Sequence, residues 1–412
     1  MSEELTIGEV YRAQMVLLDV ARHPKIIGPT NLSDKCEVFL KPENLQHTGA
    51  FKLRGAYYKI SQLTEEEKSH GVIACSAGNH AQGVALAATH NGIKSIICLP
   101  AGAPISKIEA TKRLGAEVCL VPGVYDDAYA KAIELRDQMG YTFVHPFNDP
   151  KVIAGQGTIG LEILEEMPHI DAVVVPVGGG GLISGVAFAL KTLRPDIKVF
   201  GVQAAGAPSM AKSMEKAERI HLDSVSTIAD GIAVKEPGDL TYELCQKYVD
   251  EIVTVSDDEI AAAILALIEK QKLIAEGAGA AAVAAVMFDK LPIEGKKVVC
   301  VVSGGNIDVN ILNRVINRGL LTNGRVCTIE LEVTDKPGTL LKLLAVIAEQ
   351  GANVLAVNHD RISPSEQINS CTVHLELETT DHSHIARLHK ALEKAGFRIN
   401  SGSCLLYTSD AD

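Results

Sequence analysis

Four consecutive glycines stand between an apolar run and a helical pattern, at Gly178, Gly179, Gly180 and Gly181. A helix start leaves its first backbone N–H groups unpaired, and glycine lets an anion approach them closely because it has no Cβ atom. The spacing matches neither the dinucleotide pattern G-x-G-x-x-G nor the G-K-[ST] of a nucleotide-triphosphate loop. We therefore interpret the glycines as a phosphate site, with a tight turn that binds no ligand as the alternative.

Lys52 stands among small and apolar residues at the start of a helical pattern, within the segment 47–56. Burial there would lower the pKa of its amine, and a neutral lysine amine can condense with a carbonyl group. The alternative is an ordinary lysine that extends from a helix start into solvent. Lys52 alone does not decide between the two.

Two more polar segments follow predicted strands. Ser76, Asn79 and His80 open a helix, where hydroxyl, amide and backbone donors suit a carboxylate. The alternative there is a capped helix start, with Ser76 or Asn79 as the cap. Ser303 places a hydroxyl at a strand end, which by itself indicates only a turn. A phosphate site, a reactive lysine, a carboxylate site and this hydroxyl together match pyridoxal phosphate acting on an amino acid.

Short β-branched runs alternate with longer helical patterns from about residue 70 onward, which indicates parallel sheets covered by helices. Nearly continuous apolar strands favour burial on both faces. Ligands of such folds bind where loops leave the carboxyl ends of strands, and the glycine run and Ser303 both follow strands directly. The predicted strands are 71–75, 94–99, 117–121, 172–177, 198–202 and 297–302.

A polar, glycine-containing connector at 317–325 interrupts this alternation, and we expect a second unit after it. Its predicted order, βαββαβ, is the ferredoxin-like arrangement. The strands are predicted at 326–333, 353–361, 370–378 and 397–399, and the helices at 338–350 and 383–395. The end of the chain, 404–412, fits no element of this fold and suggests an artefactual tail.

The composition narrows the class of protein. A chain of 412 residues is long enough for two or three domains, and its net charge of -12 argues against nucleic acid or an anionic membrane as partner. Nine cysteines without a C-x-x-C pair indicate reduced thiols. The acidic N-terminus argues against a signal peptide, and the lack of about 18 consecutive apolar residues argues against a membrane span. We expect a cytoplasmic enzyme. His382, His384 and His389 lack the spacing of metal ligands, so we expect no metal.

The chain resembles the fold-type II pyridoxal-phosphate enzymes, and most closely the threonine dehydratases (threonine ammonia-lyases), over about residues 5–318. The matching motifs occur in the family's order and are Phe51-Lys52-Leu-Arg-Gly-Ala56, Ser76-Ala-Gly-Asn-His80, Gly178-Gly-Gly-Gly-Leu182 and Ser303-Gly-Gly-Asn306. The resemblance implies a two-lobed α/β catalytic unit of parallel sheets, like tryptophan synthase β, followed by an α+β ferredoxin-like ACT domain. The expected boundaries are 1–318 for the catalytic unit, with a small lobe at about 48–149 inserted in the large lobe, 319–325 for a linker and 326–403 for the ACT-like domain.

The resemblance also implies roles for single residues. Lys52 would hold the cofactor covalently and then take the α-proton of the substrate. Ser303 would face the pyridine nitrogen, and its neutral hydroxyl would leave the ring a weaker electron sink, so that loss of a β-substituent competes well. The other implied contacts are Phe51 beside the ring, Asn79 on the 3-hydroxyl, Ser76, Asn79 and His80 on the substrate carboxylate, and Gly178 to Gly181 with the N–H of Leu182 on the phosphate. Glu276–Ala280 and Ala229–Ile232 resemble the family's loops beside the ring.

The implied reaction is β-elimination from L-threonine to 2-oxobutanoate and ammonia, and from L-serine to pyruvate. Serine racemases share most of the motifs, but they carry a proton-transferring serine where Ala77 stands, and a metal site where the segment 207–213 offers no carboxylate. Both departures favour elimination over racemisation. A catalytically inert sensor that binds amino acids is the alternative outside the enzymes.

The ACT-like domain would bind an amino-acid effector at its first strand-to-helix loop. Pro337 and Gly338 suit a helix start whose free N–H groups could accept a carboxylate. Isoleucine or valine is the expected effector, and ACT sites formed between subunits would make the protein a homodimer or homotetramer. A module that only drives assembly is the alternative. The sequence leaves open whether the enzyme serves biosynthesis or catabolism.

Overall fold

The computed structural model describes residues 5–361 and 369–400. The chain divides into two units at Ile311–Leu312, and each is described by itself. Within the described ranges no helix is both long and apolar enough to cross a membrane. The predicted tail at 404–412 lies outside the described residues.

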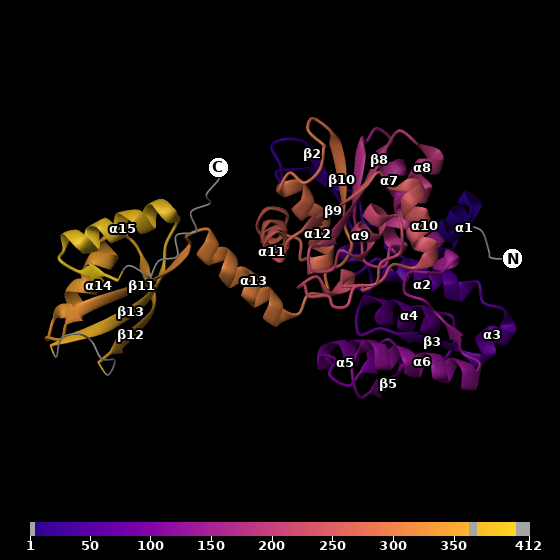
Figure 1. Ribbon diagram of the computed structural model, residues 1–412, viewed down its shortest axis with the longest axis horizontal. Coiled ribbons are helices and arrows are strands. Elements are labelled where there is room, and N and C mark those ends of the chain that lie inside the picture. The colour runs from indigo at the N-terminus through magenta and orange to yellow at the C-terminus, as the bar shows by residue number, and fades with distance from the viewer. Residues whose placement is uncertain (1–4, 362–368, 401–412) are drawn as a thin grey trace. The chain divides into compact units, whose positions relative to one another are not determined.

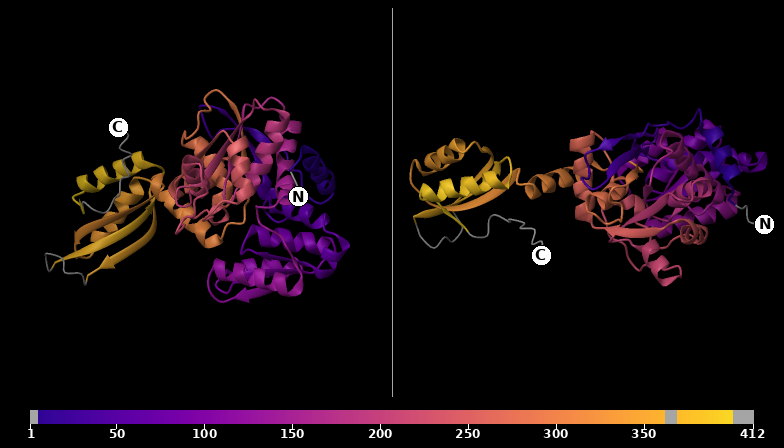
Figure 2. Two further views of the ribbon diagram at one scale, coloured as in Figure 1. Left: turned by 45° about the vertical axis from the view of Figure 1, so that its right-hand side comes forward. Right: turned by 90° about the horizontal axis from the view of Figure 1, so that it is seen from above.

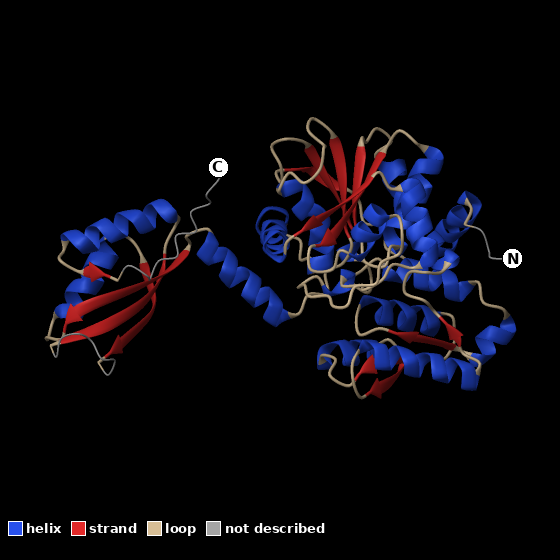
Figure 3. Ribbon diagram, in the orientation of Figure 1, coloured by secondary structure: helices blue, strands red, loops and turns tan. Residues whose placement is uncertain are grey.

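The first unit contains two sheets with helices on their faces (Figures 1 and 3). Only β1 and β2 pair antiparallel in the larger sheet, and its other pairs are parallel. In spatial order its strands are β1 (Ile27–Thr30), β2 (Glu37–Pro42), β10 (Lys297–Val302), β7 (Ala172–Pro176), β8 (Lys198–Ala204) and β9 (Glu251–Val255).

The smaller sheet is parallel throughout. Its strands, in spatial order, are β5 (Glu117–Val121), β4 (Ser95–Pro100), β3 (Val72–Cys75) and β6 (Thr142–Phe143). All of them lie between β2 and β7 in the chain. The strands predicted from apolar runs are confirmed to within two residues, whereas β1, β2, β6 and β9 were not predicted because they are short or less apolar.

Helices cover both faces of the two sheets. The helices of this unit are α1 (Ile7–Leu17), α2 (Lys52–Ser61), α3 (Glu65–His70), α4 (Asn79–His90), α5 (Ile105–Arg113), α6 (Tyr125–Met139), α7 (Pro150–Glu166), α8 (Gly181–Leu193), α9 (Ser209–Lys216), α10 (Asp239–Tyr248), α11 (Asp257–Ala266) and α12 (Gly277–Met287), with short turns η1 (Glu43–Leu45), η2 (Asp230–Ile232) and η3 (Leu267–Gln271). The helix α13 (Val309–Thr322) contains the division point.

Burial on both faces explains why the central strands are continuously apolar. Val173 and Val175 of β7 pack with residues of α7 and α8, such as Ile159 and Ile183. On the opposite face of the neighbouring β10, the thiol of Cys300 lies 3.8 Å from the carbonyl oxygen of Ala282 in α12. The expected parallel sheet with helices on both faces is therefore confirmed.

The second unit is an antiparallel sheet with two helices on one face (Figure 2). Its strands, in spatial order, are β12 (Asn353–Asp360), β13 (Ser370–Glu378), β11 (Val326–Thr334) and β14 (Arg398–Ile399), and its helices are α14 (Thr339–Glu349) and α15 (His382–Lys394). Alternate residues of β11 and β13, among them Leu331 and Val373, form its core with Leu343 and Leu388 of the helices. The predicted βαββαβ order is confirmed.

Buried ion pairs fix the position of α2 in the first unit. The guanidinium of Arg54, which is fully buried, donates two hydrogen bonds of 2.8 Å to Glu43 and also pairs with Glu162 of α7. Lys41 of β2 approaches Glu162 at 2.7 Å. Since the charges are paired, the arrangement ties η1, α2, α7 and β2 together.

We expect Arg54→Met to destabilise the protein by about 3–5 kcal/mol, because it leaves Glu43 and part of Glu162 buried without their partner. Denaturant unfolding followed by far-ultraviolet circular dichroism would measure this loss. The matched control is Arg194→Met, which removes an exposed guanidinium paired with Asp196 and should leave the midpoint nearly unchanged. Equal midpoints for the two variants would contradict the structural role of Arg54.

Candidate active site

Backbone hydrogen bonds bring three separate segments together after β10. The carbonyl oxygen of Ser303 accepts from the N–H of Phe51 at 3.1 Å, and that of Gly304 accepts from the N–H of Glu276 at 3.0 Å. Phe51 directly precedes α2 and Glu276 directly precedes α12. The strand end that carries Ser303 is therefore held between the starts of two helices, one of which begins with Lys52.

Lys52 is the first residue of α2 and is partly buried. Its Nζ donates a hydrogen bond of 2.7 Å to the carbonyl oxygen of Pro146 and lies 5.3 Å from the centroid of the Phe51 ring. Burial lowers the pKa of Lys52 to about 8, although the nearby Glu276 carboxylate opposes this shift. The amine can therefore reach its neutral, nucleophilic form near physiological pH.

Asn79 has its side-chain amide fixed at both ends. Its Nδ2 donates to Glu276 Oε1 at 2.7 Å, and its Oδ1 accepts from Asn306 Nδ2 at 2.8 Å. Asn306 is itself oriented by a 2.7 Å hydrogen bond to the carbonyl oxygen of Thr48. Because an amide nitrogen carries two hydrogens, Asn79 keeps one N–H for a further acceptor.

Glu276 is a buried carboxyl group beside this amide. Burial raises its pKa to about 7, and the charge of Asp230 adds to the rise, while the hydrogen bond from Asn79 opposes it. The group thus changes protonation near neutral pH, close to the range in which Lys52 does. Two groups that exchange protons in this range are suited to acid–base chemistry.

The glycine run connects β7 to α8, as predicted. A Cβ atom on Gly179 would lie 2.4 Å from the ring of Phe147, and Gly180 has a φ of 96°, so packing and backbone geometry already require glycine here. No side chain caps α8. In the described part of the chain, no protein group accepts a hydrogen bond from any N–H between Gly178 and Leu182. These unpaired donors, rather than the glycines themselves, favour an anion.

The helix α4 starts with Asn79 and His80, and its preceding residue Gly78 provides no side-chain cap. The hydroxyl of Ser76 accepts from the N–H of Gly78 at 3.2 Å, so it stabilises the turn. No described group accepts from the N–H of Asn79 or His80. A carboxylate would therefore be held by backbone donors at this helix start.

The imidazole of His80 is buried and uncharged. Its Nε2 lies 2.8 Å from the carbonyl oxygen of Val144, and its Nδ1 has no partner among the described atoms. Burial and the nearby Lys52 lower the pKa of His80 to about 3. The imidazole therefore provides no positive charge for a bound carboxylate. Only the backbone N–H of His80 can donate a hydrogen bond to one.

Sequence reasoning assigned no role to the segment Val144–Phe147, which contacts Lys52, His80 and the glycine run. It provides the carbonyl oxygens that face His80 and Lys52, and the ring against which Gly179 packs. Its position could have indicated a role, because the segment directly follows β6 of the smaller sheet, and ligands of such folds bind where loops leave the strand ends. The role of Asn306 was also missed, although it belongs to the motif that begins at Ser303.

The predicted effector residues lie in the second unit. Pro337 and Gly338 are exposed, and Gly338 precedes α14 with a φ of 89° and no side-chain cap. This is the helix start that the sequence predicted at 338.

Residues 25–304 match the family described as pyridoxal-phosphate dependent enzyme, and residues 323–395 match the ACT domain. The chain is 51% identical over 397 residues to the L-threonine ammonia-lyase of Thermotoga maritima, with 96% of this chain and 99% of that protein covered. Among solved structures, it is similar to a processed threonine deaminase isoform from Solanum lycopersicum, with a TM-score of 0.72, 39% identity, and 77% and 90% of the two chains covered. It is also similar to maize serine racemase, with a TM-score of 0.72, 35% identity, and coverage of 76% and 97%.

We expect Lys52 to be acetylated with a midpoint near pH 8 in protein freed of any bound cofactor, because only the neutral amine reacts and its fraction rises with pH. Peptide mass spectrometry would follow the labelling rate. The exposed Lys35, whose pKa Asp289 raises, serves as the internal control and should need a higher pH. Glu276→Gln removes the charge that raises the pKa of Lys52, so the midpoint should fall. A midpoint for Lys52 equal to that of Lys35 would contradict the role of burial.

Proposed function

This chain belongs to the pyridoxal-phosphate dependent enzyme family, and we propose that it converts L-threonine to 2-oxobutanoate and ammonia and also accepts L-serine. The observation that carries this proposal is the position of Lys52, next to the backbone hydrogen bonds that join Phe51 to Ser303 and Glu276 to Gly304. Burial there lets the Lys52 amine reach its neutral form near physiological pH. Similarity to L-threonine ammonia-lyase over nearly the whole chain supports the choice of reaction. Elimination releases one water from the β-carbon, and hydrolysis of the resulting imine to 2-oxobutanoate consumes one water, so the net change is release of ammonia.

The residues present fit pyridoxal phosphate. The unpaired N–H groups from Gly178 to Leu182 would hold the phosphate, the remaining N–H of Asn79 would bind the 3-hydroxyl, and Ser303 would face the pyridine nitrogen. The Phe51 ring would pack beside the cofactor. When bound, pyridoxal phosphate supplies an electron-withdrawing ring that acidifies the α-C–H bond of an attached amino acid.

The protein groups position the substrate and move its protons. We propose that the N–H groups at the start of α4, with Ser76 and His80 beside them, bind the carboxylate of the amino acid. Lys52 takes the α-proton as its neutral amine. Asn79 stays in one orientation because Glu276 and Asn306 hold both ends of its amide.

Ala77 favours elimination over racemisation in this proposal. Racemisation needs a second proton-transferring group on the face opposite Lys52, and a methyl group cannot transfer a proton. The similarity to maize serine racemase shows that the fold itself is compatible with both reactions. D-serine as the main product from L-serine would therefore contradict our assignment.

We also propose that the ACT domain binds isoleucine or valine between paired subunits of a homodimer or homotetramer in the cytoplasm. Pairing is supported by exposed apolar side chains, since Leu341 of α14 is 73% exposed and Leu355 of the edge strand β12 is 50% exposed. The effector carboxylate would lie at the start of α14, beside Pro337 and Gly338.

We expect Lys52→Ala to reduce 2-oxobutanoate formation from L-threonine by at least about 10³-fold, because it removes the general base. It should also abolish the visible absorbance of the bound cofactor. Steady-state assays and an absorbance spectrum of the purified protein would test both. Lys59→Ala is the matched control on the same helix, where the lysine pairs with Asp149, and it should retain most activity. A wild-type protein without visible absorbance or threonine deamination would support the inert sensor instead.

Isoleucine should inhibit 2-oxobutanoate formation in the wild type if the ACT domain provides feedback control. We expect Gly338→Ala to abolish this response, because alanine is strained at a φ of 89° and displaces the helix start. Gly351→Ala is the matched control, since Gly351 has a φ of 80° at the other end of α14 and, like Gly338, has open space around it. Equal responses of the two variants, or no response of the wild type to isoleucine or valine, would contradict the proposed effector site.

A further inference from the structure

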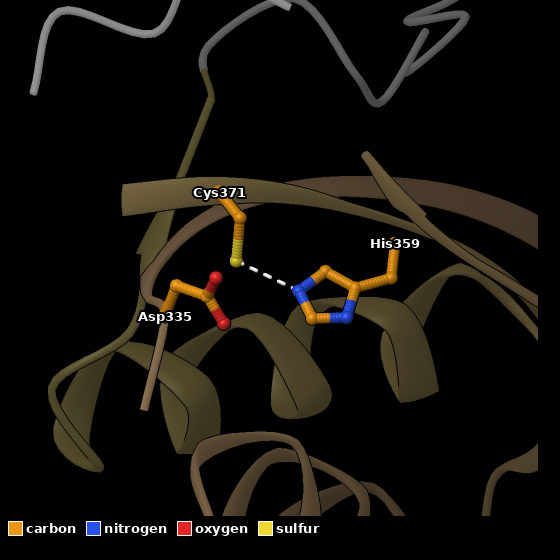
Figure 4. A group of neighbouring side chains, drawn as sticks. All are labelled: Asp335, His359 and Cys371. Carbon is orange, nitrogen blue, oxygen red and sulfur yellow. Dashed lines mark hydrogen bonds between the residues drawn. The ribbon is translucent and has the colours of Figure 1, made fainter. Parts of the chain in front are cut away.

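A carboxylate, an imidazole and a thiol meet at one end of the sheet in the second unit (Figure 4). Asp335 follows β11, His359 lies on β12 and Cys371 lies on β13. One ligand atom from each of the three residues lies within 4.8 Å of the others. His359 Nε2 and Cys371 Sγ are 2.8 Å apart.

The register of the strands brings these side chains together. Cys371 pairs with Val333, two residues before Asp335, and His359 pairs with Val373, two residues after Cys371. Paired residues share a face of a sheet, and so do residues two apart on one strand. The cluster therefore continues the face that Val333, Cys371 and Val373 bury beneath the helices.

The carboxylate, the imidazole and the thiol point toward a common position, and they do not form the hydrogen-bonded chain of a catalytic triad. In Figure 4 the Asp335 carboxylate and the Cys371 sulfur lie on the same side of the His359 ring, toward its Nε2. In a nucleophilic Cys–His–Asp arrangement, the carboxylate would instead hold the other ring nitrogen. Burial also raises the pKa of the Cys371 thiol, and Asp335 raises it further, which disfavours a free thiolate nucleophile.

We propose that Asp335, His359 and Cys371 bind one divalent cation of the zinc type. Sulfur, nitrogen and oxygen donors in this combination suit Zn²⁺, and three protein ligands leave a fourth position for water or another small ligand. Ligand atoms around zinc lie about 3–4 Å from one another, so Nε2 and Sγ need to separate by only about 1 Å. On binding, the thiol of Cys371 loses its proton to solvent and its sulfur bonds to the metal.

Arg361 competes with the cation for the carboxylate. Its Nη2 lies 3.2 Å from Asp335 Oδ1, and its Nε lies 3.2 Å from Oδ2. Metal affinity should therefore rise when this guanidinium is removed. A residue that merely stabilised the fold would not produce such an increase, so Arg361 gives the proposal a specific test.

The experiment uses the full-length holoenzyme under reducing conditions, with Zn²⁺ titrated against a chromogenic chelator. We expect one tightly bound Zn²⁺ per chain, at least tenfold weaker binding for His359→Gln and Asp335→Asn, and tighter binding for Arg361→Gln. His359 and Asp335 are exposed, so both variants should fold. His374→Gln, which alters another exposed histidine on β13, is the matched control and should leave the affinity unchanged.

Cobalt provides the second measurement. Co²⁺ in place of Zn²⁺ should give the ligand-field absorption of a tetrahedral thiolate site, and this signal should disappear in Cys371→Ser but persist in Cys36→Ser, which removes a partly exposed thiol of the other unit. Absence of stoichiometric zinc binding would overturn the proposal. So would full affinity in both His359→Gln and Asp335→Asn, or a cobalt signal independent of Cys371.

Discussion

The ion pairs of Arg54 with Glu43 and Glu162 are the interaction on which the catalytic unit depends. Burial alone would lower the pKa of Arg54, but the two carboxylates raise it, so the guanidinium stays charged inside the core. Arg54 lies two residues after Lys52 on α2. The same contacts that join α2 to η1 and α7 therefore set where the lysine amine points, without any contact to the amine itself.

The charged groups that hold α2 form ion pairs, whereas the titratable groups of the site are shifted toward their neutral forms. Burial would raise the pKa of Glu162, but Arg54 and Lys41 lower it to about 2. Lys52, His80 and Glu276 lack such close opposite charges, and burial moves each of them toward its neutral form. The ion pairs hold α2 in place, and beside it lie groups that can exchange protons near neutral pH.

The similarity to both a threonine deaminase and a serine racemase shows that the fold provides a frame shared by different reactions. The frame places a helix start with unpaired N–H groups after β7, another after β3, and a hydroxyl after β10. The proposed choice between elimination and racemisation depends on Ala77 and on the segment 207–213, which offers no carboxylate.

The sequence by itself determined most of the strands, the order of the two units and several of the segments of the candidate site. Apolar runs such as 172–177 and 297–302 are unambiguous because strands buried on both faces need no polar residues. Polar residues that follow apolar strands indicate the ligand-binding edge, which is why the sequence led us to propose Asn79 and Ser303 as site residues. The short strands β1 and β6 could not, since few residues carry their pattern.

Only the tertiary structure decided which distant groups touch. The hydrogen bonds of Asn79 with Glu276 and Asn306 join residues about 200 positions apart. The Lys52 amine likewise contacts the carbonyl oxygen of Pro146, 94 positions away. The cluster of Asp335, His359 and Cys371 arises in the same way. Its members share no spacing motif, because strand register, rather than separation along the chain, brings them to one end of a sheet.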